Sequence, residues 1–289
     1  MLKKIIKVTG VVLGGIIITG VLFYIKVYIS TEKRIHKVYS IQPEKIEIPT
    51  DAASLALGAR LATTKGCRSC HGGNLAGRIL VNDPHKLGLI AAKNITKGKG
   101  GLPQDFNYED WVMALKHGVN KDRKSLLLMP SYGFSQLTER DMAAIIAYCS
   151  QIAAVDNELP VSKIGPLGRV LTDIGELRVL SAERVDHDRP FTQGITPSLS
   201  VAYGKYQAVM CQSCHGENMK GGEPLSAGGP PVADISSTGK PGQWTDEQFM
   251  ATLRSGKTPE GKQLKMPWEM AAAMTDLELK ALHLYLKSL

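Results

Sequence analysis

Two copies of one five-residue pattern, Cys-x-x-Cys-His, constrain this chain more than any other feature. The first copy is CRSCH at residues 67–71, and the second is CQSCH at residues 211–215. The chain has five cysteines in 289 residues, so four of the five belong to this pattern. Cysteines spaced in this way serve as a redox dithiol, as half of a zinc site or as a covalent haem anchor. The rest of the sequence distinguishes these uses.

The zinc and dithiol interpretations lack the residues that they require. A structural zinc site takes four ligands, usually as two pairs close together in the sequence, whereas these pairs lie in different halves of the chain. A thioredoxin-like dithiol belongs to a βαβ unit and has no use for a histidine after its second cysteine. Cys-x-x-Cys-His is the attachment signature of c-type haem, so we predict two covalently bound haem c groups. The predicted attachment cysteines and proximal iron ligands are Cys67, Cys70, His71, Cys211, Cys214 and His215.

The two halves are also similar beyond the cysteines. The stretch MPSYGFSQLTERDMAAIIAYCSQI, which starts at Met129, aligns without a gap with MPWEMAAAMTDLELKALHLYLKSL, which starts at Met266. In both, a threonine and acidic residues precede apolar positions three and four apart, which predicts a capped amphipathic helix. A methionine thioether opposite histidine raises the reduction potential of haem iron. Met129 and Met266 are therefore the predicted second iron ligands.

Other side chains compete for the second iron position. Met270 and Met274 follow Met266 by one and two helical turns, but the first half has no methionine at the matching positions. The histidines outside the two motifs lack a matching histidine in the other half or lie in a turn-like segment, so we expect core or surface roles. The histidines weighed in this way are His85, His117 and His283.

Cys149 is the fifth cysteine, and a free thiol raises the alternative of a thiolate-ligated haem. It aligns with Leu286 on a helix rich in apolar neighbours. We therefore expect it to be a small buried hydrophobic residue.

The surroundings of the proximal histidines are less clear from sequence. Such histidines donate their second ring N–H to a carbonyl or carboxylate. We expect a carbonyl near Pro230 in the second half and one within KLGLIAAKNI in the first. The related segments NIT (residues 94–96) and DIS (residues 234–236) fit haem propionate contacts or ordinary loop capping equally well.

Both halves predict helices, and neither contains a convincing alternating strand pattern. We predict an all-α fold of two tandem domains, residues 51–155 and 196–289. Residues 156–195 form the predicted linker, which is long for a bare connection and should pack along the domains with a helical turn or two in LGRVLTDIGELRVL.

Residues 1–30 are predicted to be an N-terminal membrane anchor. Val8–Ile25 is a run of 18 residues without a charge, long enough to cross most of the apolar core of a bilayer. A cleaved signal peptide, the alternative, has a shorter apolar region that ends in small residues, whereas this run continues into VLFYIKVYIS. Lysines lie on both sides, so the positive-inside rule does not give the orientation.

The formal net charge of +8 is concentrated before residue 156. A basic face attracts acidic partners, although scattered surface lysines give the same count. No nucleic-acid-binding motif or basic run interleaved with aromatic residues occurs, so we expect no nucleic-acid partner.

With these motifs, the sequence resembles the bacterial membrane-anchored dihaem cytochromes c of class I, which contain tandem cytochrome c domains. The resemblance covers residues 51–289 and rests on both Cys-x-x-Cys-His motifs, the Met-Pro segments, NIT and the terminal helices. It implies His/Met ligation of both irons and haem domains in the periplasm, on the outer face of the bacterial inner membrane. It also implies single-electron transfer without a catalytic site.

The sequence is likewise similar to the cytochrome subunits of periplasmic or membrane dehydrogenases. The implied partners are the membrane and redox proteins that donate and accept electrons: a dehydrogenase, an oxidase or a quinol-oxidising complex. Two alternatives remain at this point. One is an electron-transfer subunit within a dehydrogenase complex. The other is a dihaem enzyme, peroxidase-like or thiosulfate-oxidising, with one catalytic haem, although a matched methionine in both halves argues against it.

Overall fold

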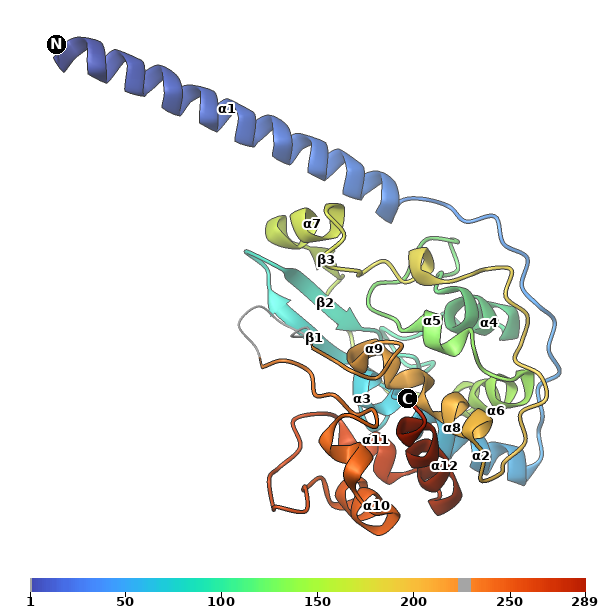
Figure 1. The fold of residues 1–289 in the computed structure, drawn as a ribbon. Coiled ribbons are helices and arrows are strands. Elements are labelled where there is room, and N and C mark those ends of the chain that lie inside the picture. Colours follow the sequence, from blue (N-terminus) through green and yellow to red (C-terminus); the bar gives the residue numbers. More distant parts are fainter. Residues whose placement is uncertain (1, 223–229) are drawn as a thin grey trace.

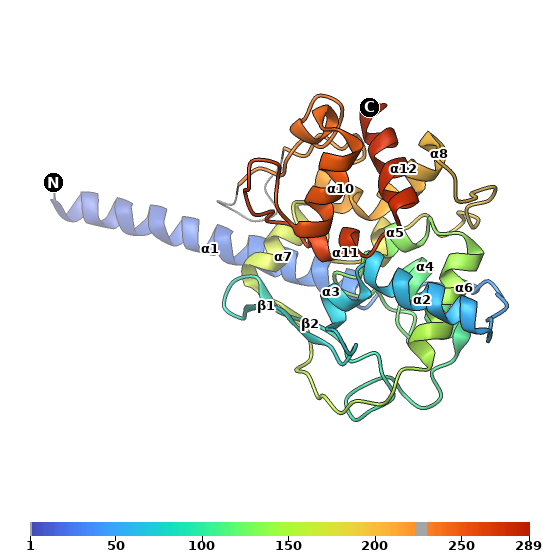
Figure 2. The same cartoon turned by 90° about the horizontal axis from the view of Figure 1, so that it is seen from below.

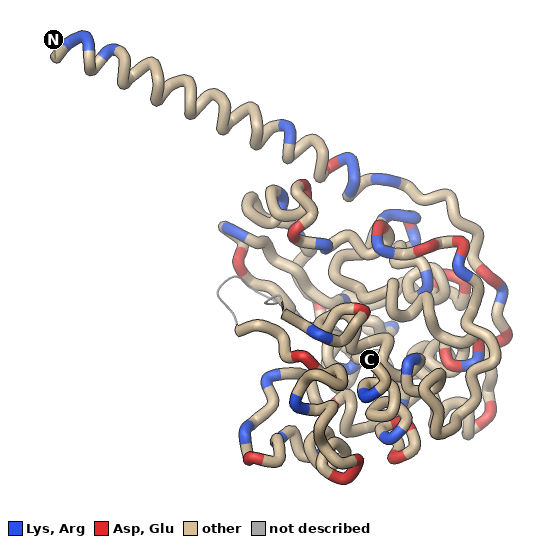
Figure 3. Tube along the Cα trace, viewed as in Figure 1, with Lys and Arg blue, Asp and Glu red and all other residues tan. Residues whose placement is uncertain are grey.

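Helix α1 (Leu2–Ile35) extends away from the rest of the molecule as a single rod (Figure 1). The computed structural model describes residues 2–222 and 230–289. The lysines and arginines of α1 lie near its two ends, and a long stretch between them carries no charge (Figure 3). The apolar side chains of this stretch are exposed and do not pack on the protein. By length and composition, α1 is able to cross a membrane.

The first half of the body is a set of short helices started by polar caps. Asp51, Asn107 and Thr138 each accept a hydrogen bond from the backbone N–H three residues on, which satisfies a free donor of the first helical turn. Gly118 ends one of these helices in the left-handed conformation, at φ +69°. The helices are α2 (Ala52–Thr64), α3 (Cys67–His71), α4 (Tyr108–His117), α5 (Ser131–Phe134) and α6 (Glu139–Ser150).

The second half repeats this order of helices. Thr275 caps the last helix and forms a capping box with Glu278, which confirms the helix predicted from the aligned C-terminal stretch. The helices are α8 (Val201–Gln207), α9 (Gln212–His215), α10 (Asp246–Ser255), α11 (Trp268–Ala272) and α12 (Asp276–Lys287), with 3-10 turns η2 (Ala208–Met210) and η3 (Lys240–Gln243).

Each half contains one very close helix crossing. In the first half, α2 meets α6 at Gly58, where an added Cβ would lie 2.0 Å from the carbonyl oxygen of Ala144. In the second half, α8 meets α12 at Gly204, where an added Cβ would lie 1.9 Å from the carbonyl oxygen of Ala281. A side chain has no room at either crossing. The two crossings therefore align α2 with α8, and α6 with α12.

The helical fold predicted from the sequence is confirmed, with one small sheet that the sequence did not indicate. A small antiparallel sheet in the order β1-β2-β3 lies beside the first half, with Val81 opposite Ile90 and Gly88 opposite Ile164. Its first two strands are short and half-buried, and the third comes from the distant linker, so no long alternating pattern marks them. The strands are β1 (Arg78–Asp83), β2 (Gly88–Ala92) and β3 (Lys163–Ile164).

Residues 156–195 pack along the body, as expected. Strand β3 extends the hairpin of β1 and β2, helix α7 (Pro166–Asp173) lies against α1, and the 3-10 turn η1 (Ala182–Arg184) contacts α5. The helix predicted in LGRVLTDIGELRVL is confirmed by α7, although it stops shortly before Gly175, whose φ is +88°.

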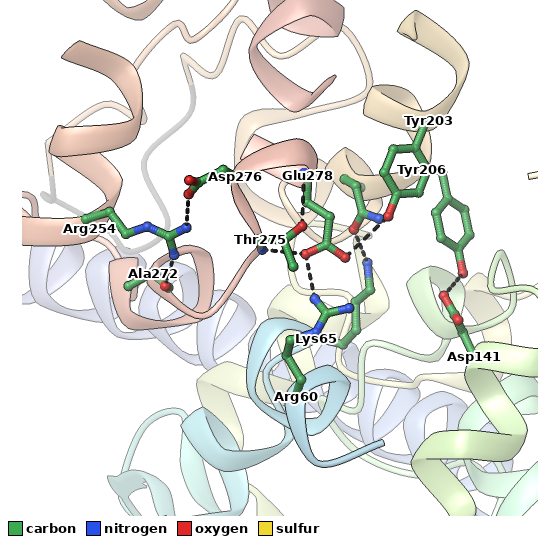
Figure 4. Close-up of polar contacts among 11 residues, drawn as sticks. Arg60, Lys65, Asp141, Tyr203, Tyr206, Arg254, Ala272, Thr275, Asp276 and Glu278 are labelled. Atoms are coloured by element: carbon green, nitrogen blue, oxygen red, sulfur yellow. Dashed lines mark hydrogen bonds and ion pairs between the residues drawn. The ribbon is translucent and has the colours of Figure 1, made fainter. Parts of the chain in front are cut away.

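The two halves meet through an interface with approximate twofold symmetry. Helices α2, α4 and α6 lie on one side of this interface, and α8, α10 and α12 lie on the other (Figure 2). Arg60 Nη1 donates to Glu278 Oε2 at 2.5 Å, and the Tyr206 hydroxyl donates to Asp141 Oδ2 at 2.6 Å (Figure 4). The first contact joins α2 to α12, and the second joins α8 to α6. The helix crossings align α2 with α8 and α12 with α6, so the two contacts are equivalent.

Two glycine–methionine contacts follow the same symmetry. An added Cβ on Gly66 would lie 2.9 Å from Cε of Met270, and one on Gly133 would lie 2.9 Å from Sδ of Met210. Gly66 and Met210 each precede the first cysteine of a motif, whereas Gly133 and Met270 occupy matching positions in the Met-Pro stretches. The interface therefore joins equivalent parts of the two candidate sites.

Candidate haem sites

The first Cys-x-x-Cys-His motif forms the short helix α3, bounded by two left-handed glycines. Gly66 precedes it at φ +87° and Gly72 follows it at φ +83°, conformations that side chains rarely adopt. One helical turn places Cys67, Cys70 and His71 on a single compact element. Cys67 and His71 are buried, and Cys70 is half-buried. The sulfurs of both cysteines are free thiols.

The second motif is built in the same way. Cys211 starts α9, Gly216 follows His215 at φ +74°, and both cysteines of the motif are free thiols. The side chain of His215 is half-buried, so this site is more open than the first. In the described part of the chain, no group of three His, Cys, Asp or Glu side chains could hold a metal ion without another donor.

Both motif histidines are held by one ring nitrogen. His71 Nδ1 donates to the carbonyl oxygen of Lys93 at 2.7 Å, and His215 Nδ1 donates to that of Ala233 at 2.8 Å. Burial lowers the pKa of both imidazoles, and the hydrogen bond to the carbonyl opposes this only in part. Each ring is therefore neutral near pH 7, and its Nε2 is left as a lone-pair donor.

These carbonyls refine the sequence prediction. Lys93 lies within the predicted segment KLGLIAAKNI, whereas the carbonyl of the second site belongs to Ala233, three residues after Pro230. The offset is explained by the polar loop that follows. The side-chain oxygen Oδ1 of Asp234 accepts hydrogen bonds from the backbone N–H of Ser236 at 2.8 Å and from its hydroxyl at 2.7 Å. This turn orients the carbonyl of Ala233, the preceding residue, towards His215.

The same observation decides the role of NIT and DIS. Asn94 Oδ1 accepts from the Thr96 backbone and hydroxyl, both at 2.9 Å, and Asn94 Nδ2 donates to the Val155 carbonyl at 2.7 Å. Asn94 and Thr96 are buried, and these loop bonds occupy their side chains. The bonds seen in both halves are therefore those of a capped loop.

The two Met-Pro segments have matching backbone geometry and matching places in the cores. Ser131 N donates to the carbonyl of Met129 and Trp268 N to that of Met266, each at 2.8 Å. Met129 packs against the core cluster that contains Cys67, and Met266 packs against the cluster that also contacts Cys211. Both methionines are half-buried. Each half thus offers two thiols, an imidazole and a thioether, a donor set that fits haem c with His/Met ligation.

The competing side chains have other contacts. Met270 lies against Gly66 of the first half, and Met274 is buried in the second core. His283 is fully buried, where Nδ1 contacts Asp246 Oδ1 at 2.7 Å and its ring stacks on Phe249. His117 Nε2 contacts a carboxylate oxygen of Glu44 at 2.9 Å, and His85 lies in the exposed turn between β1 and β2. The core and surface roles expected for these histidines are confirmed.

Cys149 is buried, as expected, but it has an unforeseen neighbour. Cys67 belongs to the same core cluster, and the interaction of the two thiols lowers the pKa of Cys67 and raises that of Cys149. The two residues lie in α6 and α3, far apart in the sequence. The helical pattern around Cys149 predicts burial but cannot indicate which residue it contacts.

Sequence reasoning also missed Lys65, a buried cation between the two sites. Its Nζ donates to Gln207 Oε1 at 3.1 Å and lies 5.2 Å from the centroid of the Tyr206 ring (Figure 4). Burial lowers the pKa of Lys65, whereas the negative charges of Asp141 and Glu278 oppose that shift. A lysine at the end of a short helix is ordinarily a surface residue, so the sequence contains no signal for this burial.

Comparisons with known proteins agree with this geometry. Residues 53–149 match the family model described as "Cytochrome C oxidase, cbb3-type, subunit III", and residues 201–289 match that described as "Cytochrome c". The fructose dehydrogenase cytochrome subunit of Gluconobacter japonicus is 26% identical over 271 residues, which cover 83% of this chain and 54% of the relative. The cytochrome c subunit of alcohol dehydrogenase (quinone) from Gluconobacter oxydans (strain 621H) is 27% identical over 280 residues, 83% of this chain and 55% of the relative.

A shorter similarity includes a third dehydrogenase. The gluconate 2-dehydrogenase cytochrome c subunit of Pantoea cypripedii is 33% identical over 96 residues, which cover 32% of this chain and 21% of the relative. The chain spans about half the length of the curated relatives that it matches over most of its sequence. Cytochrome c domains bind haem c covalently. The chain is thus a cytochrome c with two domains of this kind, similar to the cytochrome c subunits of dehydrogenases.

Proposed function

We propose that this chain is a dihaem electron carrier in which each domain binds one haem c. The matched orientation of His71 and His215 carries this proposal, because in both halves Nδ1 is held by a carbonyl and Nε2 is free to bind iron. The inferred domains are residues 51–155 and 196–289, joined by residues 156–195.

In each domain, the same four side chains have the same roles. The two cysteines would attach the haem covalently through thioether bonds, and the histidine and the methionine would ligate its iron. The residues are Cys67, Cys70, His71 and Met129 in the first domain, and Cys211, Cys214, His215 and Met266 in the second. A haem iron ligated in this way supplies one-electron chemistry. With both ligands bound, the iron would offer no open position to a substrate.

The domain interface supports electron transfer between the two haems. Gly66 and Met210 directly precede the attachment helices, and both contact the opposite domain closely through Met270 and Gly133. Each attachment site therefore lies near the ligand segment of the other domain, an arrangement that would let the two haems pass electrons to each other.

Helix α1 supports a membrane-anchored location. We infer that it crosses the bacterial inner membrane once and that the haem domains lie in the periplasm. The apolar side chains of its charge-free run are exposed, which is stable in lipid and not in water. The orientation follows from the cofactor, since covalent haem attachment of this kind takes place after export.

The relatives support a dehydrogenase as the electron donor. They are the cytochrome subunits of fructose, alcohol and gluconate dehydrogenases, and this chain spans half the length of the first two. We infer that a dehydrogenase reduces this chain and that a membrane-bound oxidase or quinone-linked complex accepts the electrons. A catalytic haem is not favoured, because both Met-Pro segments have the same backbone contacts and neither domain lacks its methionine.

Quantitative haem analysis and spectroscopy of the purified full-length chain test this function. We expect two haems per chain, and both oxidised haems should be low-spin and show the weak far-red band of a methionine–iron bond. One haem per chain, or a high-spin signal that binds peroxide, would contradict the carrier function. Purification from mildly solubilised membranes then identifies the donor by its association with the chain.

A further inference from the structure

The polar side chains of α7 face the membrane helix α1. Arg169 donates to the hydroxyl of Thr31 at 2.8 Å and to the carboxylate of Glu32 at 2.5 Å. Asp173 accepts from Nζ of Lys26 at 2.6 Å, and its side chain is only 5% exposed. These bonds attach α7 to the turns of α1 that directly follow its apolar run.

The apolar side chains of α7 face away from the protein. Leu167 and Ile174, the helical residue that caps the C-terminus of α7, lie seven residues apart, hence on one face, and they are 44% and 56% exposed. Val170 and Leu171 lie between them and are half-buried. A helix on the surface of a water-soluble protein turns its apolar face inward and its charges outward. Helix α7 does the reverse, which indicates an apolar medium on its outer side.

The depth of α7 along α1 indicates which medium this is. The uncharged run of α1, residues 8–25, is about 27 Å long at 1.5 Å per residue, close to the thickness of the hydrocarbon core. The contacts of α7 begin at Lys26, the first charged residue after this run, and so lie at the level of the lipid headgroups. Tyr28 and Ile29 are also exposed at this level, and tyrosine is common at the membrane interface.

We propose that α7 is a second membrane contact, lying in the interfacial region of the bilayer with Leu167 and Ile174 against lipid. The inference rests on the proposed membrane anchor. The apolar face of α7 contacts phospholipid, because this face lies beside the residues of α1 that leave the bilayer. The ionic bonds of α7 to α1, together with its lipid contact, hold the haem domains in one orientation on the membrane. A helical anchor alone would leave them free to rotate.

Spin labelling of the full-length, haem-loaded chain tests this inference. A nitroxide is attached to Ile174→Cys, and the protein is reconstituted into vesicles of phosphatidylethanolamine and phosphatidylglycerol. Relaxation by oxygen, which concentrates in lipid, is compared with relaxation by a water-soluble nickel chelate. Matched variants carry the label at Val12→Cys within the apolar run of α1, and at Leu199→Cys, which is 60% exposed near α8. Protein without an added cysteine gives the background, and the absorption spectrum confirms that each variant is folded and loaded.

We expect the labels at residues 12 and 174 to be more accessible to oxygen than to the chelate, and the label at residue 199 to show the opposite. If residue 12 lies in lipid but residue 174 behaves like residue 199, α7 is not a membrane contact and its apolar face is left for a protein partner. If residue 12 itself is accessible to the chelate, the anchor proposal fails first.

Discussion

The Arg60 guanidinium lies 2.5 Å from the Glu278 carboxylate and joins the two haem domains through an ion pair. The Glu278 side chain is 4% exposed, whereas that of Arg60 is 30% exposed. Burial alone would raise the pKa of Glu278, but the hydrogen bond from Arg60 and the Thr275 backbone outweigh it and lower that pKa. The carboxylate is therefore charged at neutral pH and depends on Arg60 for its compensation.

Replacing Arg60 with methionine should destabilise the docked domains. The substitution leaves the Glu278 charge buried without its partner. We expect the free energy of unfolding to fall by about 3 kcal/mol. This value is at the low end for a broken buried ion pair, because Arg60 is partly exposed. Urea denaturation of the haem-loaded protein measures the change. Lys99→Met is the control, because its pair with Glu158 is exposed on both sides and should contribute less than about 1 kcal/mol. Equal losses for the two variants would contradict a buried role for Arg60.

Lys65 should raise the reduction potential of the haems beside it. A buried cation stabilises the reduced state, which carries one more electron, so Lys65→Met should lower the potential by an amount on the order of tens of millivolts. Redox titration followed by visible absorption measures this shift. The exposed Lys99→Met variant should leave both potentials unchanged. Unchanged potentials in Lys65→Met as well would show that the buried amine is neutral.

The ligand proposal predicts a selective effect of methionine replacement. Met266→Ala should lower the potential of one haem by on the order of a hundred millivolts or more and leave the other nearly unchanged. The far-red methionine–iron band of the oxidised protein should fall to half. Met270→Ala is the matched control, because Met270 contacts Gly66 at the domain interface. If Met270→Ala removes the band and Met266→Ala does not, the ligand of the second domain is misassigned.

Acid should loosen the N-terminal segment around Glu44. Burial lowers the pKa of His117 and His187 below 6.5, the value for the unfolded chain. As the pH falls through 6.5, the unfolded chain therefore binds protons more readily than the folded protein does, and the folded state loses stability. Burial by itself would raise the pKa of Glu44, but hydrogen bonds from Lys116 and His117 lower it below 4.5, so its stabilising effect is lost at still lower pH. The free energy of unfolding should therefore decrease as the pH falls from 7 towards 4.

Urea denaturation at a series of pH values measures this dependence. His187→Gln should reduce the slope between pH 7 and pH 5, because one of the groups that bind protons on unfolding is then absent. His85→Gln, in the exposed turn between β1 and β2, should leave the slope unchanged. A slope that is unaffected by His187→Gln would assign the dependence to other groups.

The sequence predicted the features that depend on neighbouring residues. Helices started by Thr138 and Thr275 follow from caps and apolar spacing within a dozen residues. The motif cysteines and histidines are recognisable for the same reason. Lys65 and strand β3 depend on contacts between segments far apart in the chain, which a local pattern cannot encode. The position of Ala233 depends on a loop bond formed by Asp234, so the sequence located this carbonyl only to the region near Pro230.

The symmetric pairing of Arg60 with Glu278 and Tyr206 with Asp141 makes this chain a dimer within one polypeptide. In a dimer of separate chains, the occupancy of the interface would depend on protein concentration. With the domain bounds proposed above, residues 156–195 tether the two halves and keep them at a fixed effective concentration, however dilute the protein is. Neither half has to bind its counterpart tightly, because the covalent link keeps the two Cys-x-x-Cys-His sites together even when the affinity of the interface is low.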